Sequence, residues 1–356
     1  MRYVEVGGTT VSAVGLGTWQ FGSSEWGYGA DYADRQADAI VTRALDLGIT
    51  VIDTAEAYGF GRSERIVGRA LGARRAEAFV ATKLFPLFPV GPVVSQRARA
   101  SAKRLGVDCI DLYQVHQPNP LVPLTATMPA FAQLMAEGLV RHAGVSNFSL
   151  ARWKAADRAL GSPVLSNQVR YNLVDRRPEV DLVPWARDHE RLVIAYSPLA
   201  QGLLSARYDA GHRPTGLVRR ASPAFLPDNL RKAAPLLGTL REVAAAHDAT
   251  PAQVALAWLL RRPNVVVIPG ASSVAQVESN AAAADLELDQ AEDDALVAAS
   301  DAYRPVSGPA ALPRLAQDQL AATVGDATRR ISGVLARRGP GHDDEPDGAT
   351  AHGEPS

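Results

Sequence analysis

The chain has 356 residues, and its 37 lysines and arginines nearly balance 38 aspartates and glutamates, which leaves a formal net charge of −1. A near-neutral chain has no global basic field, so nucleic-acid binding is not expected. Hydrophobic residues make up 47% of the chain, which is typical of a packed globule. The length fits either two domains or one large barrel with additions.

Cysteine content and hydropathy indicate a cytoplasmic protein. Cys109 is the single cysteine, so neither an internal disulfide nor a multi-cysteine metal site can form. The N-terminus lacks the basic-then-apolar pattern of a signal peptide. No uninterrupted apolar run reaches the roughly 18 residues of a membrane span, so no association with a membrane is expected.

Short apolar runs alternate with segments of helical period along the chain. Two β-type runs around a Gly-Gly turn predict a hairpin over 3–12. Strands are predicted over 11–19, 51–54, 79–84, 109–116, 140–147, 164–172, 192–199 and 265–270. Helices are predicted over 37–48, 64–72, 97–105, 126–137, 150–160, 182–190 and 250–260. Thr250 is the expected N-cap of the last helix, with Pro251 at its first position and Gln253 completing a capping box.

Strands that alternate with helices pair in parallel, and eight such units close naturally as a (β/α)8 barrel. A doubly wound open sheet is the competing fold, but the first strand ends in GLGTWQFG and lacks its GxGxxG motif. About 25 residues rich in Gly, Pro and Arg precede a helix near 230 and predict a functional loop or lid. The segment 337–356 has almost no apolar residues beyond alanine, so we expect a barrel over 1–325 and a largely disordered tail over 326–356.

Four polar side chains stand at predicted strand ends, where barrel enzymes carry their chemistry. Asp53, Lys83 and His116 end three successive strands, and Tyr58 follows five residues after Asp53. Each has an ordinary structural explanation when taken alone, as a cap, a solvated lysine or a packed ring. Together they are delivered by consecutive units to one barrel mouth, which favours a functional site.

The four residue types suit proton transfer to a carbonyl oxygen. A lysine ammonium favours phenolate and should lower the tyrosine pKa from its usual value of about 10. The aspartate would hold the lysine, and the histidine would donate to the carbonyl oxygen. No protein nucleophile is evident, so a cofactor would have to supply hydride. A metal enzyme is disfavoured because His116 has no second ligand at helix or strand spacing, and no metal is expected.

Several motifs resemble those of the aldo-keto reductase family, from the N-terminal hairpin to about residue 300. GITVIDTAEAYGFGRSERIVG (48–68) and GLVRHAGVSNFS (138–149) resemble its two signatures, with VATKL and LYQVHQP between them. The resemblance implies that Tyr58 donates the proton in carbonyl reduction and that Lys83 and Asp53 tune it. It also implies that His116 orients the substrate carbonyl, and that a nicotinamide cofactor lies extended across the barrel mouth.

The resemblance implies a large set of cofactor contacts. Tyr196 matches the ring that stacks on the nicotinamide, and SPLAQGLL (197–204) resembles the pyrophosphate loop. Arg219 and Arg220 in the following flap are either phosphate contacts or solvated surface arginines. The implied contacts are Gly17, Thr18, Trp19, Asp53, Ser146, Asn147, Gln168, Tyr196, Ser197, Pro198, Leu199, Gln201, Gly202, Leu203, Arg207, Ile268, Gly270, Ala271, Ser272, Ser273, Gln276 and Asn280.

One departure from the family pattern concerns the cofactor. Gly270 and Gln276 stand where many members place a Lys and an Arg that clamp the 2′-phosphate, and Ser279 replaces a frequent acid near the adenine. This version resembles the branch that includes bacterial stress-type reductases and potassium-channel β subunits. That branch generally uses NADPH, so NADPH is expected, with NADH as a second option.

The expected substrate is a small carbonyl compound, reduced to an alcohol. Trp19, Tyr58, Phe85 and His116 are the expected pocket residues, with Trp26, Tyr28 and Phe60 in early loops as further aromatic candidates. Gln117 is polar where some relatives have tryptophan and leaves a more polar substrate open. The alternative function is an NADPH-binding regulatory subunit with slow turnover. Homo-oligomerisation also remains open.

Overall fold

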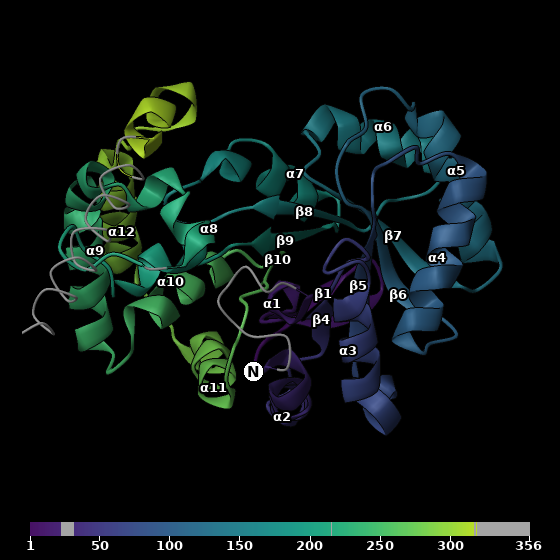
Figure 1. The fold of residues 1–356 in the computed structure, drawn as a ribbon, viewed down its shortest axis with the longest axis horizontal. Coiled ribbons are helices and arrows are strands. Elements are labelled where there is room, and N and C mark those ends of the chain that lie inside the picture. The colour runs from purple at the N-terminus through teal and green to yellow at the C-terminus, as the bar shows by residue number, and fades with distance from the viewer. Residues whose placement is uncertain (23–31, 215, 317, 319–356) are drawn as a thin grey trace, which may run out of the picture. The chain divides into compact units, whose positions relative to one another are not determined.

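The computed structural model describes residues 1–22, 32–214, 216–316 and 318 (Figure 1). Residues Met1–Pro305 form one compact unit, and a second unit begins at Val306. The first unit contains every strand in the described part of the chain. The predicted boundary at 325 and the predicted tail over 326–356 lie outside the described residues, as do Trp26 and Tyr28. No helix in the described ranges is long and apolar enough to cross a membrane.

The chain begins with the predicted hairpin. β1 (Tyr3–Val6) pairs antiparallel with β2 (Thr9–Ser12), and the turn residues Gly7 and Gly8 have φ values of 53° and 74°. Thr9 Oγ1 lies 2.7 Å from His142 Nε2, and Ser12 Oγ accepts a hydrogen bond from Thr50 N at 2.9 Å. The hairpin therefore packs at the N-terminal ends of the central strands and leaves their C-terminal ends open.

Eight parallel strands form the predicted barrel. In spatial order they are β3 (Leu16–Gly17), β4 (Val51–Asp53), β5 (Phe79–Leu84), β6 (Ile110–Val115), β7 (Val140–Ser146), β8 (Ser166–Arg170), β9 (Leu192–Tyr196) and β10 (Val265–Val267). The first and last strands meet, because Gly15 N donates to Val267 O at 2.7 Å and Gly17 N donates to Pro269 O at 3.0 Å. These bonds close the sheet, and the (β/α)8 barrel is confirmed.

Helices stand outside the strands that they connect, as Figure 1 shows for α3 to α6. The longer ones are α2 (Tyr32–Asp46), α3 (Arg62–Leu71), α4 (Gly91–Leu105), α5 (Leu124–Ala136), α6 (Leu150–Leu160), α7 (Leu182–Asp188), α9 (Pro227–Ala246), α10 (Pro251–Leu260), α11 (Val274–Ala282) and α12 (Gln290–Ala302). Shorter helical turns are α1 (Trp19–Gly22), α8 (Leu217–Arg220) and the 3-10 segments at Gly72–Glu77, Arg177–Glu179, Ala200–Ser205, Pro223–Phe225, Ala283–Asp285 and Gly308–Ala311.

The capping box at α10 is confirmed. Thr250 N donates to Gln253 Oε1 at 2.7 Å, and Gln253 N donates to Thr250 Oγ1 at 3.3 Å. This reciprocal pair satisfies two backbone donors that a helix start otherwise leaves unpaired. The Gly-, Pro- and Arg-rich stretch before α9 is a connection that contains Ala200–Ser205, α8 and Pro223–Phe225.

The predicted strand over 11–19 is wrong as a single element. Its first residues belong to β2, because the hairpin pairs Val11 and Ser12 with β1. The chain then changes partner, Leu16 and Gly17 pair in parallel with β4, and Trp19 begins α1. One continuous strand cannot pair antiparallel in a hairpin at one end of the barrel and also pair in parallel with a strand inside the barrel.

Candidate active site

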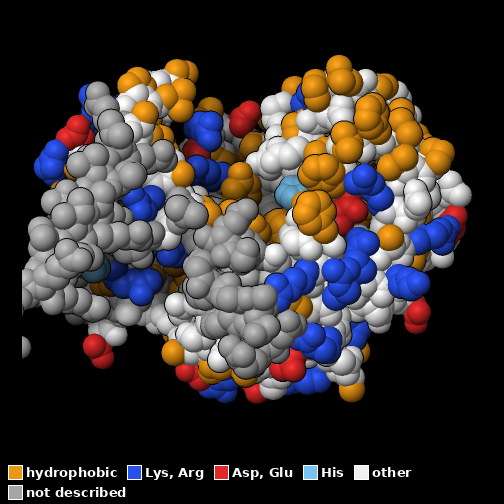
Figure 2. All heavy atoms as spheres, viewed as in Figure 1, with side chains coloured by type: hydrophobic (Ala, Val, Ile, Leu, Met, Phe, Trp, Pro, Cys, Tyr) orange, Lys and Arg blue, Asp and Glu red, His pale blue; other side chains and the backbone are white. Residues whose placement is uncertain are grey.

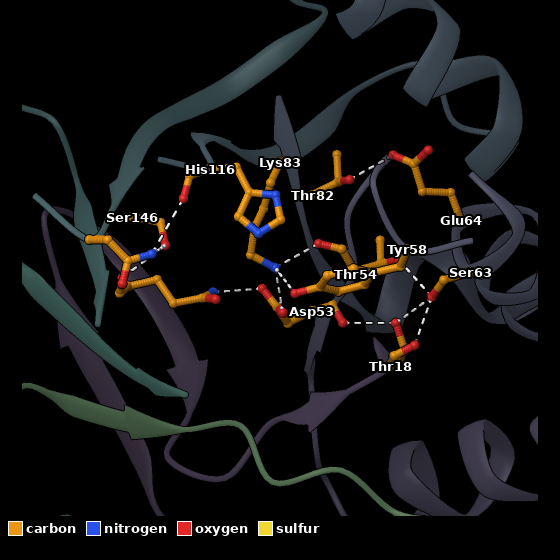
Figure 3. A network of polar contacts seen from close by, with 12 residues as sticks. Thr18, Asp53, Thr54, Tyr58, Ser63, Glu64, Thr82, Lys83, His116 and Ser146 are labelled. Carbon is orange, nitrogen blue, oxygen red and sulfur yellow. Dashed lines mark hydrogen bonds and ion pairs between the residues drawn. The ribbon is translucent and has the colours of Figure 1, made fainter. Parts of the chain in front are cut away.

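The four predicted catalytic residues meet at the C-terminal end of the barrel (Figure 3). Asp53 ends β4, Lys83 lies near the end of β5, and His116 directly follows β6. Tyr58 lies in the connection between β4 and α3. Because these strands are neighbours in the sheet and parallel, their carboxyl ends bring all four side chains together.

Lys83 is the centre of this group. Its side chain is 1% exposed, and its Nζ donates to Asp53 Oδ2 at 2.7 Å, to Thr54 O at 2.8 Å and to Tyr58 Oη at 3.2 Å. An ammonium group has three donors, and here each has an acceptor. Burial lowers the pKa of Lys83, but the Asp53 charge and the hydrogen bonds to Asp53 and Tyr58 act in the opposite direction, and the net pKa is raised. Lys83 is therefore held as a cation.

Asp53 is fixed on all sides. Its second carboxylate oxygen, Oδ1, accepts a hydrogen bond from Gln168 Nε2 at 2.7 Å. Its backbone oxygen accepts from Thr18 N at 2.9 Å and from Thr18 Oγ1 at 2.8 Å. A buried carboxylate is tolerated when it is paired and hydrogen bonded in this way. Asp53 thus joins Lys83 to β8 and to the segment after β3.

Buried polar contacts support the connection that carries Tyr58. Ser63 Oγ donates to Thr18 O at 2.8 Å and accepts from Thr54 Oγ1 at 2.9 Å. Glu64 is fully buried, and its carboxylate accepts from Thr82 Oγ1 and from Arg104 Nε, each at 2.6 Å. These bonds tie the start of α3 to β4, β5 and α4, so the tyrosine stands on a rigid base.

The expected lowering of the Tyr58 pKa is wrong as a net effect. Burial raises the pKa of the Tyr58 phenol and outweighs the nearby Lys83 charge, which lowers it; the Asp53 charge raises it further. The charged form of a phenol loses its hydration when it is buried. Tyr58 is consequently a neutral phenol near pH 7 and carries a proton that it can donate.

His116 is neutral as well. Burial first, and then the Lys83 charge, lower its pKa to about 3. Its ring meets the Tyr58 ring edge-on, with centroids 5.8 Å apart. A neutral imidazole carries one N–H, so His116 can offer a single hydrogen bond without adding charge.

A cleft of about 870 Å³ opens beside the four residues and runs across the barrel mouth. Most of the predicted cofactor contacts line it: Gly17, Thr18, Trp19, Asp53, Ser146, Asn147, Gln168, Tyr196, Ser197, Pro198, Leu199, Gln201, Gly202, Arg207, Ile268, Gly270, Ala271, Ser272, Gln276 and Asn280. Tyr58 and His116 line it too, so the predicted proton donor faces the same space as the predicted cofactor contacts.

Some predicted residues do not line the cleft. Leu203 is fully buried in the core, and the Ser273 hydroxyl caps α11 by accepting from Gln276 N. Phe85, predicted for the substrate pocket, is 43% exposed and lies outside the cleft lining. Lys83 is buried behind Asp53 and Tyr58, and Arg220 is also absent from the lining.

One corner of the cleft, next to the four predicted catalytic residues, presents side-chain amides. Asn147 has a left-handed backbone with φ 61°, and its Nδ2 donates to Ser146 Oγ at 3.0 Å. Tyr196 Oη donates to Asn147 Oδ1 at 3.0 Å, and Ser146 Oγ donates to Gln168 O at 2.9 Å. These bonds fix the direction in which each polar group faces the cleft.

The loop after β9 has an unusual backbone. Ser197, Ala200, Gln201 and Gly202 all have positive φ, between 48° and 98°. Backbone of this kind can gather N–H groups into an anion-binding concavity. The Ala200 and Gly202 N–H groups are exceptions, since they donate within the turn to Ser197 O and to Leu199 O, each at 2.9 Å. Arg219 Nε donates to Gln201 O at 3.0 Å and Arg219 lines the cleft, which connects the flap to this loop.

Several residues that line the cleft were not predicted as cofactor contacts from the sequence: Gln20, Ala57, Ser205, Thr250, Pro251, Ala252 and Pro269. Gln20 Nε2 donates to Ala271 O at 2.6 Å and so joins α1 to the segment before α11. No sequence motif marks Gln20, because its partner is about 250 positions away. In the described part of the chain, no cluster of three or more His, Cys, Asp or Glu side chains is arranged to hold a metal ion.

Comparison with known proteins agrees with this geometry. The model of the aldo/keto reductase family matches residues 13–301, and the chain belongs to that family. It is an oxidoreductase of the aldo/keto reductase type. An uncharacterized oxidoreductase of Mycobacterium tuberculosis is 56% identical over 308 residues, which cover 86% of this chain and 95% of the relative.

Two further relatives carry more specific descriptions. Methylglyoxal reductase YeaE of Escherichia coli is 34% identical over 311 residues, covering 86% of this chain and 96% of the relative. The crystal structure of an aldo-keto reductase from Klebsiella pneumoniae in complex with NADPH is 33% identical, with a TM-score of 0.70. That match covers 85% of this chain and 95% of the other.

Proposed function

We propose that the protein reduces aldehydes or ketones to alcohols with NADPH, and that Tyr58 donates the proton. One observation carries the proposal: a neutral Tyr58 phenol within 3.2 Å of a buried, charged Lys83, at the wall of a large cleft. A phenol in this position can protonate a developing alkoxide, and the adjacent ammonium stabilises the phenolate that remains.

The cleft residues fit a nicotinamide dinucleotide. Asn147 and Gln168 offer side-chain amides near Tyr58, Tyr196 offers a ring, and the left-handed loop after β9 suits phosphate oxygens. NADPH is bound by the Klebsiella pneumoniae relative. When bound, NADPH supplies a hydride to the carbonyl carbon.

The far end of the cleft bears on the choice between NADPH and NADH. Ser272 and Gln276 line it at the start of α11, where a helix N-terminus favours an anion. Gln276 Oε1 accepts from Ser272 N at 2.7 Å, so the polar group that Gln276 can offer to an anion is its amide nitrogen, which is a donor. Neutral donors and one helix end support a 2′-phosphate less strongly than a pair of cations. We therefore expect a preference for NADPH with measurable use of NADH.

The protein's own residues perform the proton transfer. The carbonyl oxygen accepts hydrogen bonds from Tyr58 Oη and from the neutral His116 ring. The Tyr58 proton moves to that oxygen as negative charge develops on it. Lys83 stabilises the resulting phenolate, and Asp53 keeps Lys83 charged and in place. The alcohol gains one hydrogen at carbon and one at oxygen, and solvent reprotonates Tyr58 after release.

The test measures NADPH oxidation with 4-nitrobenzaldehyde and with methylglyoxal. Tyr58→Phe should lower kcat by about 10²–10⁴-fold and leave the NADP⁺ dissociation constant within about twofold. Tyr3→Phe on the hairpin is the matched control and should keep full activity. Full activity in Tyr58→Phe would refute the proton-donor role. Turnover that stays very slow on every carbonyl, with tightly retained cofactor, would favour the regulatory alternative.

A further inference from the structure

One side chain in the cleft crosses the seam at which β3 and β10 close the barrel. Figure 2 shows the molecular face hollowed between the half that carries α4, α5 and α6 and the half that carries α9 and α12. Gln20 lies on α1, shortly after β3, and its Nε2 donates to Ala271 O at 2.6 Å, in the connection from β10 to α11. Gln20, Gly270 and Ala271 all line the cleft. The proton transfer proposed above gives Gln20 no role.

The Gln20 amide lies directly against Gly270. A Cβ added to Gly270 would lie 2.8 Å from Gln20 Oε1 and 3.2 Å from both Cδ and Nε2 of the same side chain. These are the three atoms nearest to such a Cβ, so the whole amide group covers the side of Gly270 on which a side chain would stand. A side chain at position 270 would therefore have to displace the amide from Ala271 O.

The backbone does not require glycine at position 270. Gly202, in the loop after β9, has φ 98°, a conformation that only glycine adopts readily, whereas Gly270 has no such positive φ. Gly270 is also exposed, so a densely packed core does not exclude a side chain there. The contact with Gln20 is the structural feature that disfavours a larger residue, and we infer that the two residues form a matched pair.

The connection between β10 and α11 is held one peptide group at a time. At its start, Pro269 O accepts from Gly17 N at 3.0 Å. At its end, Ser272 N donates to Gln276 Oε1 at 2.7 Å. Between these two bonds, Gln20 holds the middle of the connection to α1. Loss of the Gln20 amide would free the peptide group next to Ser272, at the end of the cleft where the start of α11 favours an anion.

We propose that Gln20 is a positioning residue for the 2′-phosphate end of the cofactor, and that its amide keeps position 270 a glycine. Gln20 holds the connection between β10 and α11 so that Ser272 and Gln276 face the phosphate. The inference rests on the proposed function and deepens it, because it concerns how much more tightly the site holds NADPH than NADH. Gln20 acts through the backbone that it holds, so it should leave the proton transfer at Tyr58 unchanged.

The test measures dissociation constants for NADP⁺ and NAD⁺ by tryptophan fluorescence, together with NADPH-dependent reduction of 4-nitrobenzaldehyde. Gln20→Ala should weaken NADP⁺ binding about fivefold, which is the typical effect of one lost hydrogen bond, and NAD⁺ binding less than about twofold. The KM for NADPH should rise about fivefold, while kcat stays within about twofold of wild type. This separation of KM from kcat is not expected from a general loss of structure.

A second variant tests the pairing of the two residues. The methyl group of Gly270→Ala should displace the Gln20 amide, so this variant should also weaken NADP⁺ binding about fivefold. In a Gln20→Ala background the atoms nearest to that methyl group are gone, and Gly270→Ala should then add less than about twofold. Independent losses, which multiply to about 25-fold in the double variant, would overturn the pairing.

Gln133→Ala is the matched control. Gln133 is exposed on α5, donates to Glu137 Oε1 at 2.9 Å and lies outside the cleft lining, so the same change should leave both dissociation constants as in wild type. Equal weakening of NADP⁺ and NAD⁺ in Gln20→Ala would place Gln20 at a part common to both cofactors and overturn the positioning role. Unchanged NADP⁺ binding in Gln20→Ala would overturn it as well.

Binding and turnover together separate this inference from the proposed function. If wild type binds NADP⁺ in a Gln20-dependent manner and reduces no carbonyl compound, the proposed function fails and the positioning role stands. If wild type reduces carbonyl compounds and Gln20→Ala binds NADP⁺ as tightly as wild type, the proposed function stands and the positioning role fails. A wild type that binds neither nucleotide would overturn both.

Discussion

Acidification from pH 7 to pH 5 should destabilise the wild-type protein by about 2 kcal/mol more than a His116→Gln variant. The reason is the low pKa of His116, about 3 in the folded protein. An unfolded chain has its usual histidine pKa of about 6.5. Between these values the unfolded chain binds a proton that the folded protein does not bind. Stability is therefore unaffected above about pH 6.5 and falls as the pH drops toward 3.

The magnitude follows from the two pKa values. At pH 7 the unfolded histidine is mostly neutral, and at pH 5 it is almost fully protonated while the folded one is still neutral. Protonation of this histidine favours the unfolded over the folded state by a factor that is about 25 times larger at pH 5 than at pH 7. This factor corresponds to about 2 kcal/mol in the free energy of unfolding. For a domain of this size the melting temperature shifts by about 2 °C per kcal/mol, so the expected difference is about 4 °C.

Thermal unfolding of both proteins at pH 7, 6 and 5 measures the effect. The comparison cancels the other histidines, including His142, whose pKa burial also lowers. A carbon-13 spectrum of the His116 ring should show no titration above pH 4. A wild-type–variant difference in melting temperature that is the same at all three pH values would refute the assignment of a buried neutral His116.

Other substitutions give equally direct tests. Lys83→Met should lower the free energy of unfolding by about 3–5 kcal/mol, measured in urea, because its buried carboxylate partner loses its counter-charge. Gly22→Ala should lower kcat at least tenfold, because the new Cβ would lie 2.5 Å from the backbone of Tyr58; Gly238→Ala, with open space around it on α9, should keep full activity. Gln276→Glu should reduce the ratio of kcat/KM for NADPH over NADH about tenfold, because the new carboxylate repels a 2′-phosphate. An unchanged ratio would show that Gln276 does not contact the 2′-phosphate.

The strand and helix pattern was predictable because it depends on local periodicity. β5 matches its predicted span of 79–84, and the Thr250 capping box forms as expected. The break in the predicted strand over 11–19 depends on two different partners, β1 and β4, which lie on opposite sides of it in the sequence. Such a change of partner leaves no mark in the local hydrophobic pattern.

The site was predictable in composition and less so in electrostatics. The order of Asp53, Lys83 and His116 along three strands places them at one mouth, and this needs only the parallel topology. The Tyr58 pKa depends on how far the phenol is removed from water, which the sequence does not reveal, and burial reverses the expected direction. The left-handed backbone of Phe60, with φ 51°, is likewise a conformation that no propensity rule predicts for phenylalanine.

The closure of the barrel between β3 and β10 has a consequence for folding. Few hydrogen bonds form this seam, and it joins residues about 250 positions apart, so the loop that it closes is among the most entropically costly in the chain. Gly17 and Gly270 form a parallel bridge on either side of the seam, and both line the cleft. A dinucleotide in that cleft would contact both ends of this loop, so its binding should stabilise the folded protein, in which the barrel is closed.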